Sequence, residues 1–152
     1  MGKSTVTFTL DTSEAAHLLA AFADLPTVLA NTVRGQALMV AHSEASRLQA
    51  AAAAGGKQAA LIAPSITAKE SDGFPAISAG GSARIPGKTA RYSDVLFGAE
   101  FGGQNTRATM QFRPHLGKQG YWLFPTLRED TGELLAAMEV AIDQAEQAVG
   151  LI

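Results

Sequence analysis

The first pattern along the chain is a strict alternation of polar and apolar residues over 5–10, which predicts a half-buried strand. Residues 11–13 are all of types that cap helix N-termini, and the alanine- and leucine-rich run at 14–22 predicts a short first helix. Asp24-Leu25-Pro26 interrupts that run. Because proline suits the first position of a helix, a second helix is expected to begin at Pro26.

Apolar residues at helical spacing continue over 26–54 and predict a long second helix that ends at Gly55-Gly56. A helix over that range would span about 43 Å, whereas a compact chain of this size has a radius of gyration of about 15 Å. We therefore expect the helix to bend near Gly35 or to lie across a neighbouring copy of the chain. The simpler alternative is a long helix with a seam of small residues.

A β-hairpin is predicted next, because Asp72-Gly73 is a favoured two-residue turn between the segments 66–71 and 74–79. Pairing across that turn sets Ala68 opposite Ile77 and keeps the apolar residues of both segments on one face. Pro75 has no amide hydrogen to donate, so an outer strand is expected at that position.

Seven of the ten aromatic residues fall between Tyr92 and Pro125, in a stretch that is also rich in glycine and in basic residues. Aromatic side chains carry much of the apolar area of a small core, so the helices are expected to pack against this stretch. A helical turn is predicted over 93–100, closed by Gly102-Gly103, and a last helix with an apolar stripe is predicted to begin at Pro125.

The chain of 152 residues is expected to form a single domain over 1–152. Flexible segments are expected at 80–91, which is punctuated by glycine, serine and proline, and at 103–120, which is a long loop without periodicity. Within the second segment, 109–112 has the pattern of a short strand. Together the elements predict an α+β fold, in which a small antiparallel β-sheet with a β-hairpin packs against a long N-terminal helix and a C-terminal helix.

Charge is distributed unevenly, although the net charge is only −2. Residues 84–118 carry a local excess of +4, whereas residues 125–150 carry a local excess of −5. Either these are two ordinary solvated faces, or the basic segment of one copy meets the acidic helix of the next, as a head-to-tail ring requires. The sequence leaves both interpretations open.

Residue types that carry chemistry are sparse. The absence of cysteine excludes disulfides, thiolate metal sites and a cysteine nucleophile, and the three histidines do not have metal-ligand spacing. Glu100 is either a buried acid with a raised pKa or, as we favour, a structural carboxylate that accepts hydrogen bonds from loop amides or an arginine. No apolar run reaches the length of a membrane span, and no secretory signal is visible. We expect no enzyme, cofactor or metal site.

Two short motifs carry a resemblance to a known family. Gly98-Ala99-Glu100-Phe101-Gly102 and, more loosely, Phe124-Pro125-Thr126-Leu127 resemble motifs of the small neck proteins of long-tailed bacteriophages. This is the tail-completion or head–tail joining family, related to tail terminators. The expected order of elements over 13–149 is also similar: an N-terminal helix, a β-hairpin, the Glu-Phe-Gly motif, and a proline-and-aromatic segment that leads into a C-terminal helix.

This resemblance implies a virion structural protein of the neck, assembled in the host cytoplasm. Identical subunits, often six, would form a ring that completes or terminates the tail tube and joins it to the head connector. The implied partners are further copies, a head-connector or stopper protein and a tail tube protein, with DNA passing through the ring without specific binding. The residues that we expect at a subunit or partner interface are Glu100, Phe101, Arg107, Phe112, Arg113, Lys118, Trp122, Glu139 and Asp143.

Two other functional classes remain open. A small enzyme or ligand-binding protein would use the aromatic, glycine-rich stretch 92–125 as its pocket, with Glu100 as acid or base. A DNA-binding accessory protein would use Arg107, Arg113 and Lys118 interleaved with Phe112. The overall acidic charge argues against DNA binding as the main role.

Overall fold

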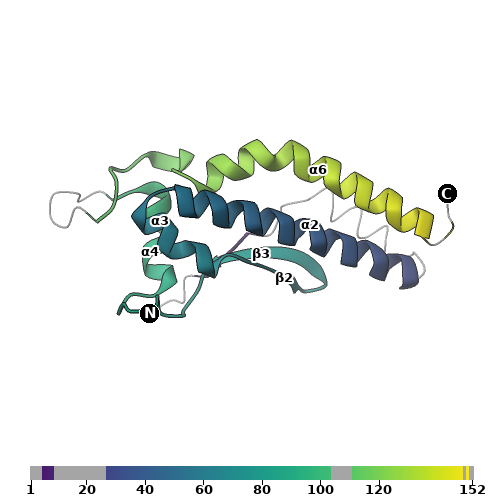
Figure 1. Cartoon of the computed structure of the whole chain (residues 1–152), viewed down its shortest axis with the longest axis horizontal. Coiled ribbons are helices and arrows are strands. Elements are labelled where there is room, and N and C mark those ends of the chain that lie inside the picture. Colours follow the sequence, from purple (N-terminus) through teal and green to yellow (C-terminus); the bar gives the residue numbers. More distant parts are fainter. Residues whose placement is uncertain (1–4, 9–26, 104–110, 149, 151–152) are drawn as a thin grey trace.

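The computed structural model describes residues 5–8, 27–103, 111–148 and 150 (Figure 1). Their elements, in chain order, are β1 (Thr5–Phe8), α2 (Thr27–Ala54), α3 (Lys57–Ile62), the 3-10 turn η1 (Ala63–Ser65), β2 (Thr67–Ser71), β3 (Phe74–Gly80), α4 (Tyr92–Phe101), the 3-10 turn η2 (Gly117–Gln119) and α6 (Leu123–Ala148). The three strands form one antiparallel sheet. The predicted α+β fold is confirmed. The helix predicted at 14–22 lies outside the described residues.

The long helix α2 is predicted almost to the residue, because no strong helix breaker occurs between Pro26 and Gly55-Gly56. Figure 1 shows that the molecule is elongated and that α6 runs beside α2 in the opposite direction. The length of α2 is therefore accommodated by a long body within one chain. The buried residues of α2 form a stripe at helical spacing: Leu29, Val33, Ala37, Ala41, Glu44, Ala45, Leu48 and Ala52.

The hairpin forms with the predicted turn and register. Asp72 and Gly73 both have positive φ angles (54° and 80°), as a type I′ turn requires, and Ala68 pairs with Ile77. The sheet order is β1-β3-β2, so β3 is the central strand. Pro75 is tolerated there because β1 pairs only with residues 77–80, which leaves the Pro75 end of β3 with β2 as its one described neighbour.

The elements stack as three layers, with α2 in the middle. The strands β2 and β3 contact one side of α2, and α6 contacts the other (Figure 1). The main core lies where α2, α3, α4 and the sheet meet, and it includes Leu48, Ile62, Leu96 and Trp122. A second and much smaller buried cluster lies where the start of α2 meets the end of α6; it consists of Leu29, Val33 and Ala145, with Ile142 packed against it.

The segment 80–91, which the sequence predicts to be flexible, is tied to the body. Ile85 is buried, its N–H donates to the carbonyl of Ala90, and Arg84 and Arg91 form an isolated β-bridge. In the second predicted flexible segment, residues 104–110 lie outside the described residues. Of the strand predicted at 109–112, residues 109 and 110 lie outside the described residues, and residues 111 and 112 are not in a strand. The backbone pairing described nearby is a single bridge between Gly103 and Pro114.

Candidate functional site

The site begins with α4, the short helix that carries the Gly-Ala-Glu-Phe-Gly motif. The carboxylate of Asp94 accepts a hydrogen bond from the Arg91 N–H (2.8 Å), which stabilises the first turn. Gly102, with a φ of 77°, ends the helix. The buried face of α4 packs against α3 and β3, and it places Glu100 in the interior with 1% of its surface exposed.

Glu100 caps the first turn of α6. Its Oε2 accepts hydrogen bonds from the backbone N–H groups of Trp122 (3.1 Å) and Leu123 (2.8 Å), and its Oε1 accepts one from that of Phe124 (2.9 Å). The first N–H groups of a helix have no partner within the helix and lie at the positive end of its dipole. A buried carboxylate is therefore well compensated here. The predicted structural carboxylate is confirmed, with backbone amides as its partners.

Three glycines around this cap are required by close approach. A Cβ atom on Gly98 would lie 2.5 Å from the ring of Phe112, and one on Gly102 would overlap the carbonyl oxygen of Pro114. Gly120 has a φ of 75°, and a Cβ there would overlap Oε1 of Glu100 itself. These three glycines thus allow α4 to pack closely against residues 112–114 and against the segment that leads into α6.

Aromatic side chains extend this junction to the surface. Phe101 stacks between Phe97 and Phe124, with ring centroids 6.2 and 5.6 Å apart. Phe97 is 48% exposed, so the stack runs from the interior to solvent. Trp122, in contrast, is buried in the main core, and its Nε1–H finds no acceptor among the described residues.

Arg113 contacts its own chain. Its guanidinium donates a hydrogen bond to the carbonyl of Gly55 (2.8 Å) and lies over the ring of Tyr121, 5.0 Å from the centroid. The hydroxyl of Tyr121 in turn donates to the carbonyl of Pro114 (2.6 Å). These contacts fasten residues 111–121 to the C-terminal end of α2.

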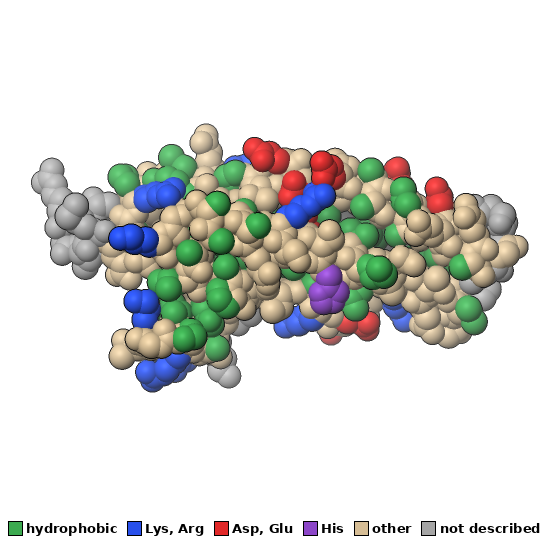
Figure 2. Space-filling view, in the orientation of Figure 1, with side chains coloured by type: hydrophobic (Ala, Val, Ile, Leu, Met, Phe, Trp, Pro, Cys, Tyr) green, Lys and Arg blue, Asp and Glu red, His purple; other side chains and the backbone are tan. Residues whose placement is uncertain are grey.

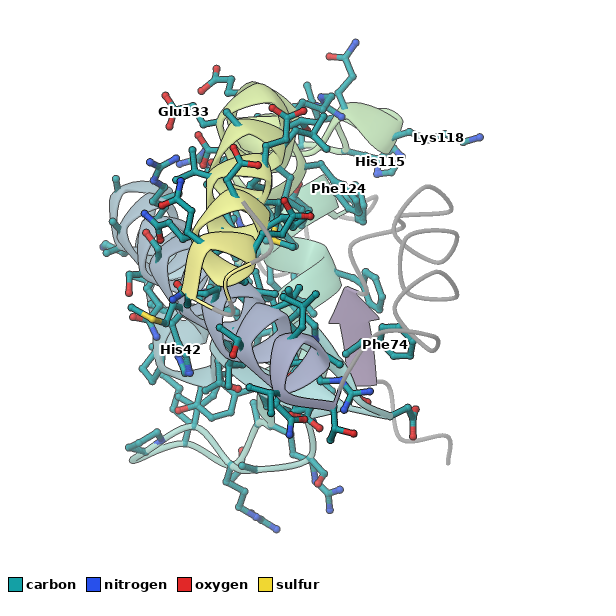
Figure 3. The ribbon with its side chains drawn as sticks, turned by 90° about the vertical axis from the view of Figure 1, so that its right-hand side faces the viewer. His42, Phe74, His115, Lys118, Phe124 and Glu133 are labelled. Atoms are coloured by element: carbon teal, nitrogen blue, oxygen red, sulfur yellow. The ribbon has the colours of Figure 1, made fainter. Side chains whose placement is uncertain are left out.

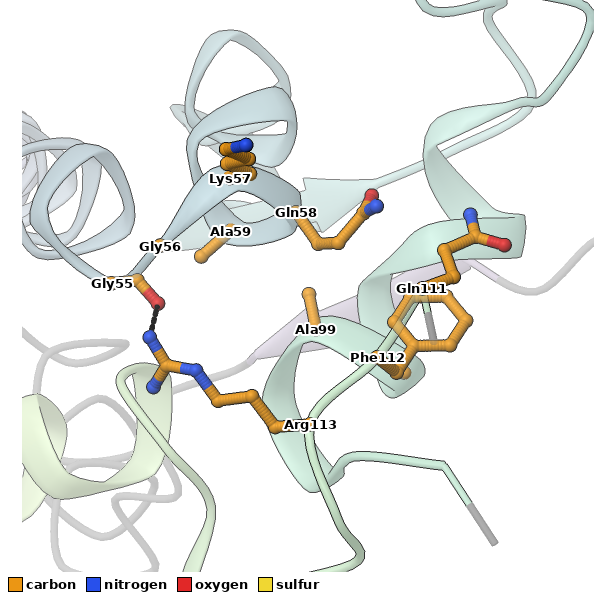
Figure 4. Close-up of a pocket in the computed structure, with 10 residues that line it drawn as sticks. Gly55, Gly56, Lys57, Gln58, Ala59, Ala99, Gln111, Phe112 and Arg113 are labelled. Carbon is orange, nitrogen blue, oxygen red and sulfur yellow. Dashed lines mark hydrogen bonds between the residues drawn. The ribbon is translucent and has the colours of Figure 1, made fainter. Parts of the chain in front are cut away.

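A small pocket of about 110 Å³ lies beside this contact (Figure 4). Its walls are the start of α3, the middle of α4 and the segment 111–113, and the side chains that line it include Lys57, Gln58 and Arg113. Ligand pockets for drug-sized molecules are usually about 300–1,000 Å³. No carboxylate lines this pocket, since Glu100 points to the α6 amides instead.

The residues expected at an interface fall into three groups. Glu100 and Trp122 are buried within the single chain. Phe101, Phe112 and Arg113 belong to the junction between α4, α6 and the end of α2. Lys118, Glu139 and Asp143 are exposed, and Figure 3 shows Lys118 projecting away from the body. Arg107 lies outside the described residues.

Exposed charge is distributed unevenly over the molecule. Figure 2 shows Lys and Arg side chains at the end that carries α3 and α4, and Asp and Glu side chains along α6. The exposed basic residues of this end, which we call the basic end, are Lys57, Arg84, Lys88, Arg91, Arg113 and Lys118. The exposed acidic residues of α6, which we call the acidic face, are Glu129, Glu133, Glu139 and Asp143.

A second site lies between α2 and α6 and was missed from the sequence. Glu44 is 1% exposed, and neither carboxylate oxygen accepts a hydrogen bond from a described donor. Arg47, one turn away, directs its guanidinium to Glu133 (2.5 Å) and Asp130 (3.7 Å) on α6. We call these four residues the Glu44 cluster. The signal in the sequence is the place of Glu44 on the apolar stripe of α2, between Ala41 and Leu48.

The Glu44 cluster holds more negative than positive charge. Burial and, to a lesser extent, the nearby Asp130 and Glu133 carboxylates together raise the pKa of Glu44 from 4.5 to about 7, while Arg47 opposes the change. A buried carboxyl group without a hydrogen-bond partner is much more stable as the neutral acid than as the anion. Glu44 is therefore stable in this position chiefly as the neutral acid.

Among the described residues, no group of three histidine, aspartate or glutamate side chains is arranged to hold a metal ion. None of the described helices is long and apolar enough to cross a membrane. Comparisons with protein-family models, curated proteins and solved structures found no match for this chain.

Proposed function

We propose that this protein is a structural subunit of the neck of a long-tailed bacteriophage. Identical copies, six in the simplest case, form a ring that completes or terminates the tail tube and joins it to the head connector. The observation that carries the proposal is the separation of exposed charge between the basic end and the acidic face. A head-to-tail ring needs two different, complementary surfaces on each subunit.

Apolar side chains accompany the charges on both surfaces. Phe97 (48%) and Leu116 (43%) are exposed at the basic end, and Leu135 (54%) and Val140 (53%) are exposed on α6. Subunit interfaces commonly place apolar and aromatic side chains at the centre and charged side chains at the rim. The pairing of these two surfaces between neighbouring copies would bury both pairs of residues and match the opposite charges.

The use of the Glu-Phe-Gly motif also supports a structural role. Both oxygens of Glu100 accept hydrogen bonds from backbone amides of the chain itself, so this side chain holds the start of α6 in place. In the proposed ring, DNA passes through without specific binding, and the partners are further copies, the connector or stopper protein and the tail tube protein. The mature location is the virion.

Deletion of the gene from the parent phage or prophage tests the role directly. Negative-stain electron microscopy of the lysate should show filled heads beside detached tails, or tails of uncontrolled length. Uncontrolled length would indicate tail termination, and detached tails of normal length would indicate joining. Intact infectious particles would refute the proposal.

Charge-reversal substitutions then test whether the basic end and the acidic face pair between neighbouring copies. A plasmid that supplies Lys88→Glu/Lys118→Glu, or Glu139→Lys/Asp143→Lys, should fail to complement the deletion, because like charges would face each other. The variant with all four substitutions should restore particles at least in part. Arg113 is not a suitable probe, since its reversal would remove the bond to Gly55 within the subunit. Full complementation by both double variants would exclude these surfaces from the interface.

A further inference from the structure

Helix α6 is held to the body at three places of different strength. Its first turn is capped by Glu100 and continues the main core through Trp122 and Leu123. Its second contact is the Glu44 cluster, one to two turns further on. Its remaining length packs along α2, with Leu134 and Ala141 buried and with the second buried cluster around Leu29, Val33 and Ala145 at the far end.

Gly132 lies two residues after Asp130, in the interior of α6. A Cβ atom at this glycine would meet nothing within 4 Å, so no close packing requires it. Glycine in a helix interior costs about 1 kcal/mol relative to alanine and makes the backbone easier to distort. Gly132 is therefore a position of low helix propensity between the capped first turns and residues 133–148, which we call the α6 arm.

The contact at the Glu44 cluster depends on the proton of Glu44, because a negative charge at this buried position would be unfavourable. Both oxygens of Glu44 are buried, and the one nearby guanidinium among the described residues is directed to Asp130 and Glu133. The charged groups that act on Glu44 come from its own helix (Arg47) and from α6 (Asp130 and Glu133). An ionised Glu44 would be a buried charge that faces two further carboxylates, which is strongly unfavourable.

A recess of about 80 Å³ gives this group a route to solvent. It lies along the seam between the two helices and is lined by Val40, Ser43, Glu44, Arg47, Glu133, Leu134 and Ala137. Protons can therefore exchange with Glu44 without unfolding of the protein.

We propose that the proton on the buried carboxyl group of Glu44 holds the α6 arm against α2, and that loss of this proton releases the arm. In the closed state Glu44 is buried and neutral. In the released state Glu44 is solvated and ionised, and Leu134, Ala141 and Ala145 are exposed. The inference concerns a single chain and does not rest on the proposed ring.

The proton linkage defines the pH range. Burial and Asp130 raise the pKa of Glu44 to about 7 in the closed state, while a solvated glutamate has its ordinary value of 4.5. Release is therefore coupled to the loss of one proton between these two values. The opening equilibrium should increase about tenfold per pH unit between pH 5 and 7 and level off above pH 7.

Hydrogen–deuterium exchange of the full chain at pH 5, 6, 7 and 8, corrected for the intrinsic pH dependence of exchange, measures this opening. We expect the protection of residues 133–148 to fall by about tenfold per unit between pH 5 and 7 and then to remain constant. Protection of α4 and of residues 45–54 should change less. The backbone amides of residues 133–148 report directly on the opening of the arm.

Two variants of the acid pair separate the proposed cause from a general effect of pH. Glu44→Gln keeps the shape of the neutral acid but does not titrate, so the pH dependence of the arm should disappear. If Glu44→Gln does not fold, Asp130→Asn serves instead, because Asp130 is only partly buried and its charge raises the pKa of Glu44. In that variant the pKa of Glu44 should be lower, so the opening of the α6 arm should rise less with pH and should level off at a lower pH.

Two glycine variants test the hinge. Gly132→Ala should reduce the opening of the arm about fivefold, which corresponds to the helix propensity of about 1 kcal/mol. Gly35→Ala in α2 is the matched control, since its surroundings are also open, and it should leave the arm's opening relative to α4 unchanged. Arm protection that does not depend on pH, or the same pH dependence in Glu44→Gln, would overturn the proposal. A loss of protection that is equal in all elements would overturn it as well.

Discussion

Position 100 tolerates a buried carboxylate because three backbone N–H groups converge on it. Those groups would otherwise be buried without partners at the start of α6, and burial without a partner costs about 1–3 kcal/mol for each polar group. One side chain therefore satisfies an entire helix terminus. This residue couples α4 to α6 more directly than the surrounding apolar contacts do.

Replacement of Glu100 by Gln should lower the free energy of unfolding by about 2 kcal/mol. The amide retains one acceptor oxygen but loses the negative charge, and hydrogen bonds to charged groups contribute about 1.5–3 kcal/mol. Urea denaturation followed by circular dichroism measures the change. Glu139→Gln, on the exposed face of α6, is the control and should change stability by less than about 0.5 kcal/mol. Equal effects of the two variants would contradict the cap.

The same substitution by alanine can be compared at Gly120 and Gly117. Both have a φ of 75°, but only at Gly120 would a Cβ atom overlap Glu100. Gly117→Ala should cost about 1 kcal/mol from backbone strain alone. Gly120→Ala should cost at least about 2 kcal/mol more, because the carboxylate would have to leave the α6 amides. Thermal denaturation of both variants gives the comparison, and similar melting temperatures would show that the overlap is relieved at little cost.

At the scale of elements, α4 and α2 each contain a glycine, but the two glycines have opposite surroundings. Gly98 lies in α4 so that the ring of Phe112 can contact the helix backbone, whereas Gly35 lies in α2 with nothing near it. The same change, Gly to Ala, should therefore have opposite signs. We expect Gly35→Ala to stabilise the protein by about 0.5–1 kcal/mol through helix propensity. Gly98→Ala should destabilise it by about 1–3 kcal/mol through overpacking. Chemical denaturation measures both, and a stabilising Gly98→Ala would contradict the Phe112 contact.

The contact between α2 and α6 should also make stability depend on pH. Between the ordinary pKa of 4.5 and the raised pKa of about 7, folded Glu44 keeps a proton that unfolded Glu44 has lost. The free energy of unfolding should therefore fall as pH rises through this range, by at most about 3 kcal/mol, and should stay constant above it. The difference between wild type and Glu44→Gln isolates this contribution from the other carboxylates. Denaturation curves at pH 5, 6, 7 and 8 measure it, and a constant difference would contradict the neutral acid.

At the scale of the whole molecule, the elongated shape separates the basic end from the acidic face. The basic end and the acidic face lie on different parts of the body, so one copy cannot pair them with each other, while a second copy can (Figure 2). Electrostatic contacts of this kind accelerate and orient association more than they strengthen it.

Association of purified copies should therefore weaken with salt. We expect the apparent association constant to fall at least about tenfold between 50 and 500 mM NaCl, because the Debye length shortens from roughly 14 to 4 Å over this range. Sedimentation velocity measures it, with the variant Lys88→Glu/Lys118→Glu as the control that should remain monomeric at both salt concentrations. Association that is independent of salt would show that apolar contacts alone join the copies.

Much of the fold follows from signals that act within a few residues. Asp72-Gly73 imposes a tight turn and thereby the register of the hairpin, and Gly55-Gly56 ends α2 because glycine readily adopts conformations that a helix cannot continue. The structural role of Glu100 is also accessible from the sequence, since a lone acid among glycines and aromatics without catalytic partners favours hydrogen bonding to loop amides. Such inferences need no knowledge of which distant elements meet.

Tertiary structure alone decided the contacts between segments far apart in the chain. Arg113 binds the carbonyl of Gly55, and Arg47 reaches Glu133 across 86 positions, so neither partner is visible in a local pattern. Glu44 is a buried acid because α6 covers that side of α2, and the segment 80–91 contacts the body because Ile85 enters a core built from other elements. Local sequence determines backbone geometry through sterics and capping, whereas burial and charge pairing depend on which surfaces fold against each other.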